Sequence, residues 1–253
     1  MLQGLTDLQP YSSRVERGGS YSLIHKLGRL APLTPDDRVA LNDMVGSADW
    51  IAQGRFVARE GDRGETLHIV LHGWVCRHRD FRDGRRQIIA VLLSGDLCGD
   101  HERLDLPLDD GYLALTRARV ARVPKSIFRR TLSEHPAIAH GFARASLIDR
   151  AILRTWLVSF GQRQGYERTA HFFCELAHRA SEHNLDVSDG VFGLPLTQQE
   201  LGCALGMTSV HVHRVLQRLR AERLIDLHGG VLSILDLERL GAIAGFDPAY
   251  LGL

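Results

Sequence analysis

The sequence predicts an α+β fold of two domains, in which an antiparallel, double-stranded, jelly-roll-like β-roll precedes a long helix and a winged helix-turn-helix. Three observations carry this prediction. From residue 54 the hydrophobic period becomes strand-like, with turn signals roughly every eleven residues. A helix of about twenty-five residues then follows Pro136 without a break. Residues 196–235 finally predict two helices, a strand, a Gly-Gly turn and another strand.

Composition limits the class of protein. With 253 residues, 44% of them apolar, the chain can bury the cores of two domains. A net charge of +1 shows no overall preference for nucleic acid, so DNA binding must be argued from local motifs. No segment reaches roughly 18 apolar residues and the N-terminus has no signal-peptide core, which predicts a cytoplasmic protein with no membrane partner. Four widely separated cysteines predict neither a zinc site nor disulfides.

The β-roll is predicted from alternating segments between turns. Residues 22–50 first read as helical, with Leu23, Leu27 and Leu30 on one face and Pro35 at the start of a second helix. The segments that follow alternate apolar and polar residues, as strands with one solvated face do: RFVARE, TLHIVLHG, WVCRHRDF and RQIIAVLL. After an acidic loop, residues 112–123 continue this alternation as strand.

The long helix after Pro136 carries an apolar stripe in steps of three and four residues. This spacing allows the helix to pack against its own copy as a two-stranded coil, which predicts a dimerisation helix. The alternative is that the stripe only covers the β-roll. The stripe consists of Ile138, Phe142, Ala145, Ile148, Ile152 and Trp156.

The segment LTQQELGCALGMTSVHVHRVLQRLR, residues 196–220, predicts the helix-turn-helix. Thr197 and Glu200 have the spacing of a capping box, and Gly206 allows the left-handed backbone of the turn. Thr208 can cap the second helix. The N-terminal turn of such a helix can read base edges in the major groove, with Arg214 suited to guanine and Val210 to a thymine methyl. The predicted DNA-binding residues are Thr208, Ser209, Val210, His211, His213, Arg214, Gln217 and Arg218.

An ordinary helical hairpin with a basic face is the alternative for so short a motif. The segment LIDLHGGVLSIL, residues 224–235, argues against it, because a strand, a Gly-Gly turn and a strand form the wing that braces a recognition helix. A last amphipathic helix, LDLERLGAIAG, is predicted to close the domain, with the tail FDPAYL packed back on it.

This order of parts resembles the Crp/Fnr superfamily of bacterial transcription regulators. The resemblance rests on the Gly61-Asp62 and Gly95-Asp96 turns, Gly73, and the LTQQELG…RVLQRLR segment. It implies a cyclic-nucleotide-binding-like domain, a homodimer through the long helix, two-fold symmetric DNA sites and contact with RNA polymerase. The chain then divides into an N-terminal arm, the β-roll domain, the dimerisation helix with its hinge, and the DNA-binding domain: 1–21, 22–134, 135–163 and 164–253.

The sequence also departs from the family pattern. Where cyclic-AMP-binding members carry a Gly-Glu pair and a later arginine, this chain has Gly99, Asp100 and His101, followed by Asp109 and Asp110. Carboxylates there would repel a cyclic phosphate, so we expect no cyclic AMP binding and take the first three as effector-pocket candidates. Val210 replaces the glutamate that many members place there, which leaves the DNA half-site sequence open.

No cofactor is predicted. An iron–sulfur cluster would need several N-terminal cysteines, and the first cysteine is Cys76. Histidines of the roll, such as His68 and His72, leave open a cupin-like metalloenzyme, but a carboxylate partner is missing from the pattern, so we predict no metal and no enzyme. Cys76 and Cys98 are redox-sensor candidates, although buried, inert thiols are the favoured interpretation. Control by an unidentified small ligand or redox signal in the roll, or by abundance alone, stays open.

Overall fold

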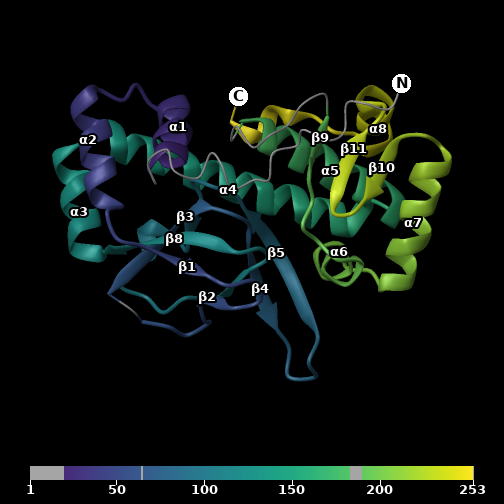
Figure 1. Cartoon of the computed structure of the whole chain (residues 1–253), viewed down its shortest axis with the longest axis horizontal. Helices are drawn as coiled ribbons and strands as arrows, with labels where there is room; N and C mark the ends of the chain where they lie inside the picture. Colours follow the sequence, from purple (N-terminus) through teal and green to yellow (C-terminus); the bar gives the residue numbers. More distant parts are fainter. Residues whose placement is uncertain (1–19, 64, 183–189, 253) are drawn as a thin grey trace.

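The computed structural model describes residues 20–63, 65–182 and 190–252. It confirms the predicted α+β architecture, with a β-roll, a long helix and a winged helix-turn-helix (Figure 1). Residues 1–19, most of the predicted arm, lie outside the described part of the chain.

The β-roll consists of two antiparallel four-stranded sheets. One sheet has the order β1 (Ala48–Ile51), β8 (Ala118–Pro124), β3 (Thr66–His72) and β6 (Leu97–Cys98). The other has the order β2 (Phe56–Ala58), β7 (Gly111–Ala114), β4 (Val75–Asp80) and β5 (Arg86–Leu92). Apolar side chains of both sheets form a core of the roll, as the alternating pattern predicted.

Residues 112–123, predicted as one continuous strand, form parts of two strands that lie in different sheets. β7 ends at Ala114 and β8 begins at Ala118, because the chain crosses between the sheets beside Gly73. A Cβ on Gly73, whose φ is +82°, would lie 2.6 Å from the Arg117 carbonyl oxygen. Alternation alone could not reveal a crossover that depends on this distant close approach.

Helices flank the roll. α1 (Tyr21–Leu30) buries Leu23, Leu27 and Leu30 as predicted, and α2 (Pro35–Met44) begins with a capping box formed by Thr34 and Asp37. The prediction of helix through residue 50 was wrong, because β1 pairs with β8 there. A short 3₁₀ helix, η1 (His101–Arg103), and α3 (Lys125–Glu134) were not predicted.

α4 (Pro136–Gln162) is the predicted long helix, but its apolar stripe faces the chain's own core. Ile138 and Phe142 pack with α1 and the first sheet, whereas Ile152 and Trp156 pack with the C-terminal domain. These four side chains are buried in a single chain, so in this conformation they cannot contact a second copy. The prediction that these four residues form the dimer contact was therefore wrong. As in the alternative interpretation of the stripe, they cover the chain's own domains.

The C-terminal domain follows a break at residues 163–164, within the predicted hinge. Its helices are α5 (Gly165–Glu182), α6 (Gln198–Leu205), α7 (Ser209–Ala221), α8 (Leu237–Ala244) and the 3₁₀ helix η2 (Pro248–Leu251). A three-stranded sheet holds β10 (Ile225–His228), β11 (Val231–Ile234) and β9 (Val191–Gly193), the last of which was not predicted. Gly229 and Gly230, both at positive φ, make the predicted wing turn.

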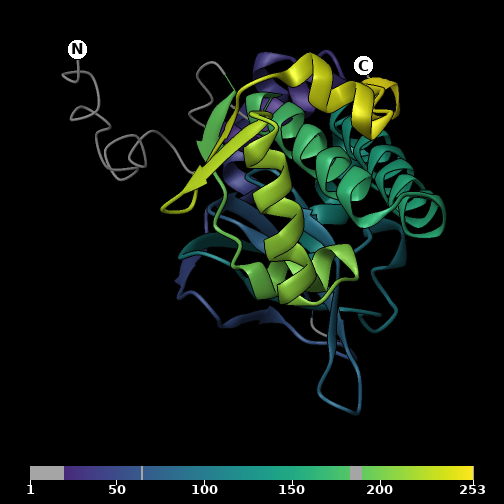
Figure 2. The ribbon, with the colours of Figure 1, turned by 90° about the vertical axis from the view of Figure 1, so that its right-hand side faces the viewer.

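The two domains are docked on each other. α6 packs against β5, and α4 runs along the back of both domains in the view of Figure 1 (Figures 1 and 2). One hydrophobic cluster joins Trp74, Ile88 and Val91 of the roll to Phe173 and Leu201 of the C-terminal domain. Because apolar burial favours association, this shared core holds the domains together.

Candidate nucleic-acid interface

The second helix of the predicted helix-turn-helix begins as the sequence indicates. The Thr208 side chain accepts a hydrogen bond from the His211 backbone N–H at 3.2 Å, and α7 starts at Ser209. The helix before it, α6, carries the predicted Thr197–Glu200 capping box, and Gly206 ends it at φ +63°. The inner residues of α7 are all buried: Val212, Val215, Leu216 and Leu219.

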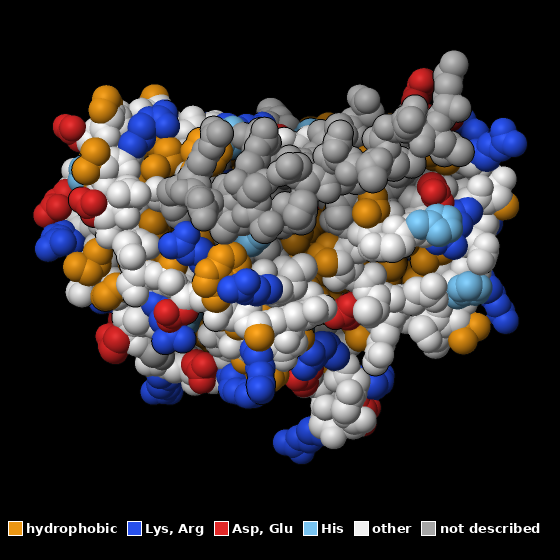
Figure 3. Space-filling model, in the orientation of Figure 1, with side chains coloured by type: hydrophobic (Ala, Val, Ile, Leu, Met, Phe, Trp, Pro, Cys, Tyr) orange, Lys and Arg blue, Asp and Glu red, His pale blue; other side chains and the backbone are white. Residues whose placement is uncertain are grey.

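The eight predicted DNA-binding residues are all exposed. Burial of the inner face turns them outward on α7, at the end of the molecule that lies at the right of Figure 1 and faces the viewer in Figure 2. Histidine and basic side chains are visible on this side of the surface (Figure 3). Such a face, at a helix N-terminus with free backbone N–H groups, suits contact with phosphates and base edges.

Besides the Thr208 cap, Arg218 and His211 also contact other parts of the chain. Arg218 forms an ion pair with Glu222 at 2.8 Å and stacks on the Tyr166 ring, with its guanidinium carbon 3.9 Å from the ring centroid. His211 lies against Gly165, where an added Cβ would come within 3.1 Å of the imidazole. The recognition helix is thereby braced on the start of α5.

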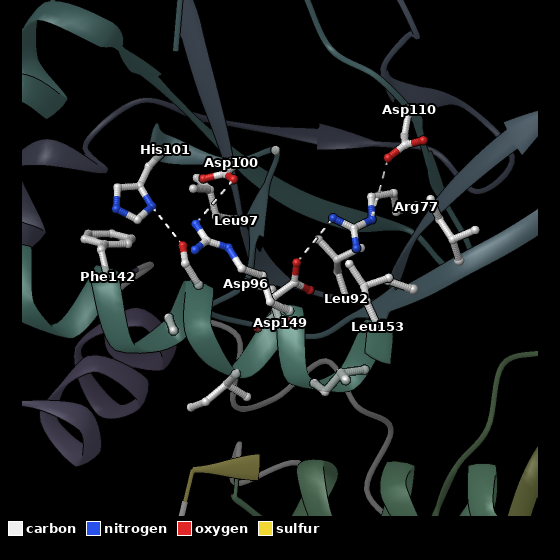
Figure 4. A pocket seen from close by; sticks show the side chains of 18 of the residues that line it. Arg77, Leu92, Asp96, Leu97, Asp100, His101, Asp110, Phe142, Asp149 and Leu153 are labelled. Carbon is white, nitrogen blue, oxygen red and sulfur yellow. Dashed lines mark hydrogen bonds and ion pairs between the residues drawn. The ribbon is translucent and has the colours of Figure 1, made fainter. Parts of the chain in front are cut away.

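A cavity of about 390 Å³ lies between the roll, α4 and the C-terminal domain. It contains all three effector-pocket candidates, Gly99, Asp100 and His101. The His101 ring nitrogen lies 3.0 Å from the Ser146 hydroxyl, and Asp100 pairs with Arg150 at 3.7 Å (Figure 4). Burial lowers the pKa of His101 despite the neighbouring Asp100.

Arg77 is the main side chain of this cavity that sequence reasoning did not assign. Its guanidinium lies between Asp149 of α4, at 3.3 Å, and Asp110, at 4.0 Å (Figure 4). Burial opposes its charge, but Asp149 foremost raises the pKa of Arg77 overall. The sequence did hold a signal for this contact. Asp149 directly follows Ile148, so a carboxylate stands next to the apolar stripe of α4.

Asp109 and Asp110 line the cavity as the sequence comparison with cyclic-AMP-binding members anticipated. Asp109 pairs with Arg103, and Asp110 accepts a hydrogen bond from Arg79 at 2.9 Å. Their charges are therefore partly compensated by these arginines.

The histidines and cysteines of the roll do not assemble into a metal site. Among the described residues, no group of three or more His, Cys, Asp or Glu side chains could hold a metal ion. Burial raises the pKa of Cys76 to about 12 and raises that of Cys98 as well, which favours the thiol over the reactive thiolate. None of the helices in that part of the chain combines the length and the apolar content that a membrane span requires.

Two known families match the chain in the order of its domains. Residues 49–135 match the cyclic nucleotide-binding domain, and residues 167–243 match the Crp-like helix-turn-helix domain. The chain belongs to the Crp/Fnr family. This Crp/Fnr protein is accordingly a transcription regulator with a DNA-binding helix-turn-helix domain.

Individual proteins are similar to this chain over more than three quarters of its length. The transcriptional activator protein FnrL of Cereibacter sphaeroides is 27% identical over 77% of this Crp/Fnr chain and 79% of its own length. The nitrogen fixation regulation protein FixK of Bradyrhizobium diazoefficiens is 27% identical over 79% and 83%, respectively. The structure of FixK2 from Bradyrhizobium japonicum has the same fold, with a TM-score of 0.70 at 22% identity over 79% of this chain and 98% of that one.

Proposed function

We propose that this regulator binds two-fold symmetric DNA sites as a homodimer, with the N-terminal half of α7 in the major groove. The observation that supports this proposal is that all eight predicted DNA-binding residues are exposed on a helix that is capped and packed on its inner face. In this proposal Arg214 contacts guanine and Val210 contacts a thymine methyl, while His211 and Gln217 contact phosphate.

The experiment that tests this proposal is selection of binding sites from random duplex DNA by the full chain, at fixed salt and without added ligand. Recovery of a palindromic site, with half-sites about one helical turn apart, is the expected result. Recovery of a single, non-repeated half-site would contradict the dimeric part of the proposal. Recovery of no preferred sequence would contradict ligand-free reading of DNA.

The dimer interface is proposed on the outer face of α4, opposite the buried stripe. Leu147, Ala151 and Val158 recur there in steps of four and seven residues, and Leu157 beside them is 73% exposed. This spacing is the repeat with which two helices pack as a coiled coil. Ala145 and Ile148 of the predicted stripe are half-buried and line the cavity inside the chain, so they lie outside this face.

Measurement of mass in solution by light scattering tests this interface. Val158→Glu is expected to shift the protein from dimer to monomer, because a charge would be buried between the helices. Val39→Glu is the matched control, since Val39 on α2 is exposed to a similar extent, 59% against 56%. Dimers that persist in Val158→Glu, or are lost in both variants, would contradict the assignment.

A second proposal concerns control by a small effector in the cavity. Its volume of about 390 Å³ is that of a ligand site, and its walls come from the roll, α4 and the C-terminal domain. Because Asp109 and Asp110 line it, we expect no thermal shift with cyclic AMP; such a shift would contradict the exclusion. If no member of a broad small-molecule panel shifts the unfolding temperature, activity that follows protein abundance is favoured instead.

The remaining parts of the proposal follow from the Crp/Fnr resemblance. The protein acts in the bacterial cytoplasm, contacts RNA polymerase and has no enzymatic activity of its own. A reconstituted transcription assay on a selected site tests the polymerase contact, since an increase in transcript yield above that of the polymerase alone requires communication with the polymerase.

A further inference from the structure

The docked arrangement of the two domains leaves charged groups buried between them. Glu175 of α5 is fully buried and accepts hydrogen bonds from the Trp156 indole N–H, at 3.1 Å to each carboxylate oxygen, and from the Tyr250 hydroxyl at 2.7 Å. One turn later, Arg179 lies 3.5 Å from Glu175 through Nη1. Burial raises the pKa of Glu175, against the opposing effect of Arg179.

Arg179 carries this network from the C-terminal domain into the β-roll. Its Nη2 donates to the backbone carbonyl of Val91 at 2.8 Å and to the carboxylate of Asp96 at 3.2 Å. Both charged side chains are about nine-tenths buried, and Asp96 also pairs with Lys26 of α1. The contact therefore joins α5 to the edge strand β5 and to the turn before β6.

The C-terminal segment closes the same junction. Leu251 is buried in the core shared by the two domains. A Cβ on Gly252 would lie 2.6 Å from the Ile148 side chain of α4, so the backbone is seated directly on that helix. Arg179, Asp96, Leu251 and Gly252 all line the cavity described above.

A buried ion-pair network of this kind contributes more to a unique orientation of the two domains than to the free energy of their association. An ion pair gains little net free energy from burial, but one misplaced partner leaves an uncompensated charge. Sliding or rotation of the domains would separate Arg179 from both Val91 and Asp96, whereas an apolar interface alone would tolerate small shifts. The network thus selects one docked orientation among those that the apolar surfaces permit.

We infer that Arg179, with Glu175 and Tyr250 behind it, is an interdomain lock that holds the DNA-binding domain in one orientation on the β-roll. The inference goes beyond DNA recognition, because it concerns how the reader is placed by the rest of the chain. The break between α4 and α5 at residues 163–164 supplies the hinge about which an unlocked domain turns.

Hydrogen exchange of the full chain tests the lock. β5 is the edge strand of its sheet and α6 packs against it, so undocking exposes its backbone. Arg179→Met is expected to accelerate exchange in peptides covering β5 and α6 by roughly tenfold, without a similar change in β3 and β8 of the other sheet. Arg239→Met is the matched control, because Arg239 is exposed on α8 and forms a local ion pair with Asp236 at 3.6 Å.

Tyr250→Phe provides the milder variant, since it removes one hydroxyl from the hydrogen bonds to Glu175 and leaves the aromatic ring. Local acceleration at β5 and α6 in both variants supports the lock. Unchanged exchange at β5 in a folded Arg179→Met chain overturns it. Where Arg179→Met unfolds the whole chain, Tyr250→Phe decides: acceleration confined to β5 and α6 supports the lock, and wild-type exchange overturns it.

Discussion

The guanidinium of Arg168 donates a hydrogen bond through Nη1 to the carbonyl oxygen of Leu205 at 2.6 Å. Leu205 ends α6, so this bond satisfies a carbonyl at the turn of the helix-turn-helix. The Nη2 of the same side chain donates to the carbonyls of Arg163 at 2.9 Å and Phe160 at 3.4 Å, at the end of α4. One side chain thereby ties the hinge to the DNA-reading motif.

Replacing Arg168 by Met tests this tie. Methionine retains an apolar stem but leaves three carbonyls without their charged donor, and hydrogen bonds to charged groups are each worth about 1.5–3 kcal/mol. We expect Arg168→Met to lower the free energy of unfolding by on the order of 2 kcal/mol, measured by denaturant titration. Arg239→Met should change it little, and equal effects of the two variants would argue against the tie.

Arg214 is predicted to supply much of the sequence specificity. Arg214→Ala should weaken binding to a selected site by ~1–3 kcal/mol, while binding to scrambled DNA falls less, because only a base contact distinguishes the two duplexes. Fluorescence titration at fixed salt measures both affinities. Arg129→Ala is the control, since Arg129 is exposed on α3, at the opposite end of the molecule from α7 (Figure 1). Equal losses on the two duplexes would assign Arg214 to phosphate instead.

The helix-turn-helix could be predicted from sequence because its determinants are local. Thr197 and Glu200 are three residues apart, Gly206 acts through its own φ, and the inner positions of α7 follow from the helical period. The Gly-Gly turn of the wing is equally local. Each signal lies within one turn of the residue whose conformation it determines.

The residues that cover the apolar stripe of α4, and the docking of the two domains, could not be predicted in the same way. Periodicity shows that one side of α4 is apolar, but not whether another chain or the chain's own domains cover it. Trp156 is covered by α5, and Arg179 meets a carbonyl 88 residues away in the roll. Such contacts depend on tertiary placement, which no local pattern encodes.

Gly73 and Gly84 make a matched pair for a stability test. Both have positive φ, +82° and +84°, but a Cβ on Gly73 would lie 2.6 Å from the Arg117 carbonyl, whereas nothing lies within 4 Å at Gly84. Gly84→Ala should cost about 1–2 kcal/mol from backbone strain alone. Gly73→Ala should cost clearly more, because backbone must move at the crossover between the sheets. Equal unfolding midpoints for the two variants would contradict the proposed close approach.

His171 gives the stability of the C-terminal domain a pH dependence. It is buried among aromatic rings, with the Phe246 centroid at 5.4 Å and that of Tyr250 at 6.1 Å. Burial, assisted by Arg163, lowers the pKa of His171 from 6.5 to about 4. Between these values the unfolded chain binds a proton that the folded chain does not, so the free energy of unfolding must fall as the pH falls.

At pH 5 the loss from His171 should be on the order of 2 kcal/mol relative to pH 7.5, since one pKa unit corresponds to about 1.4 kcal/mol. Denaturant titrations of the wild-type chain and His171→Gln at both pH values measure it. Half-buried histidines such as His68 and His72 also have lowered pKa values, so only the difference between the two proteins isolates His171. His171→Gln should lose less stability on acidification. The same loss in both proteins would show that the pKa of His171 does not differ between the folded and the unfolded chain.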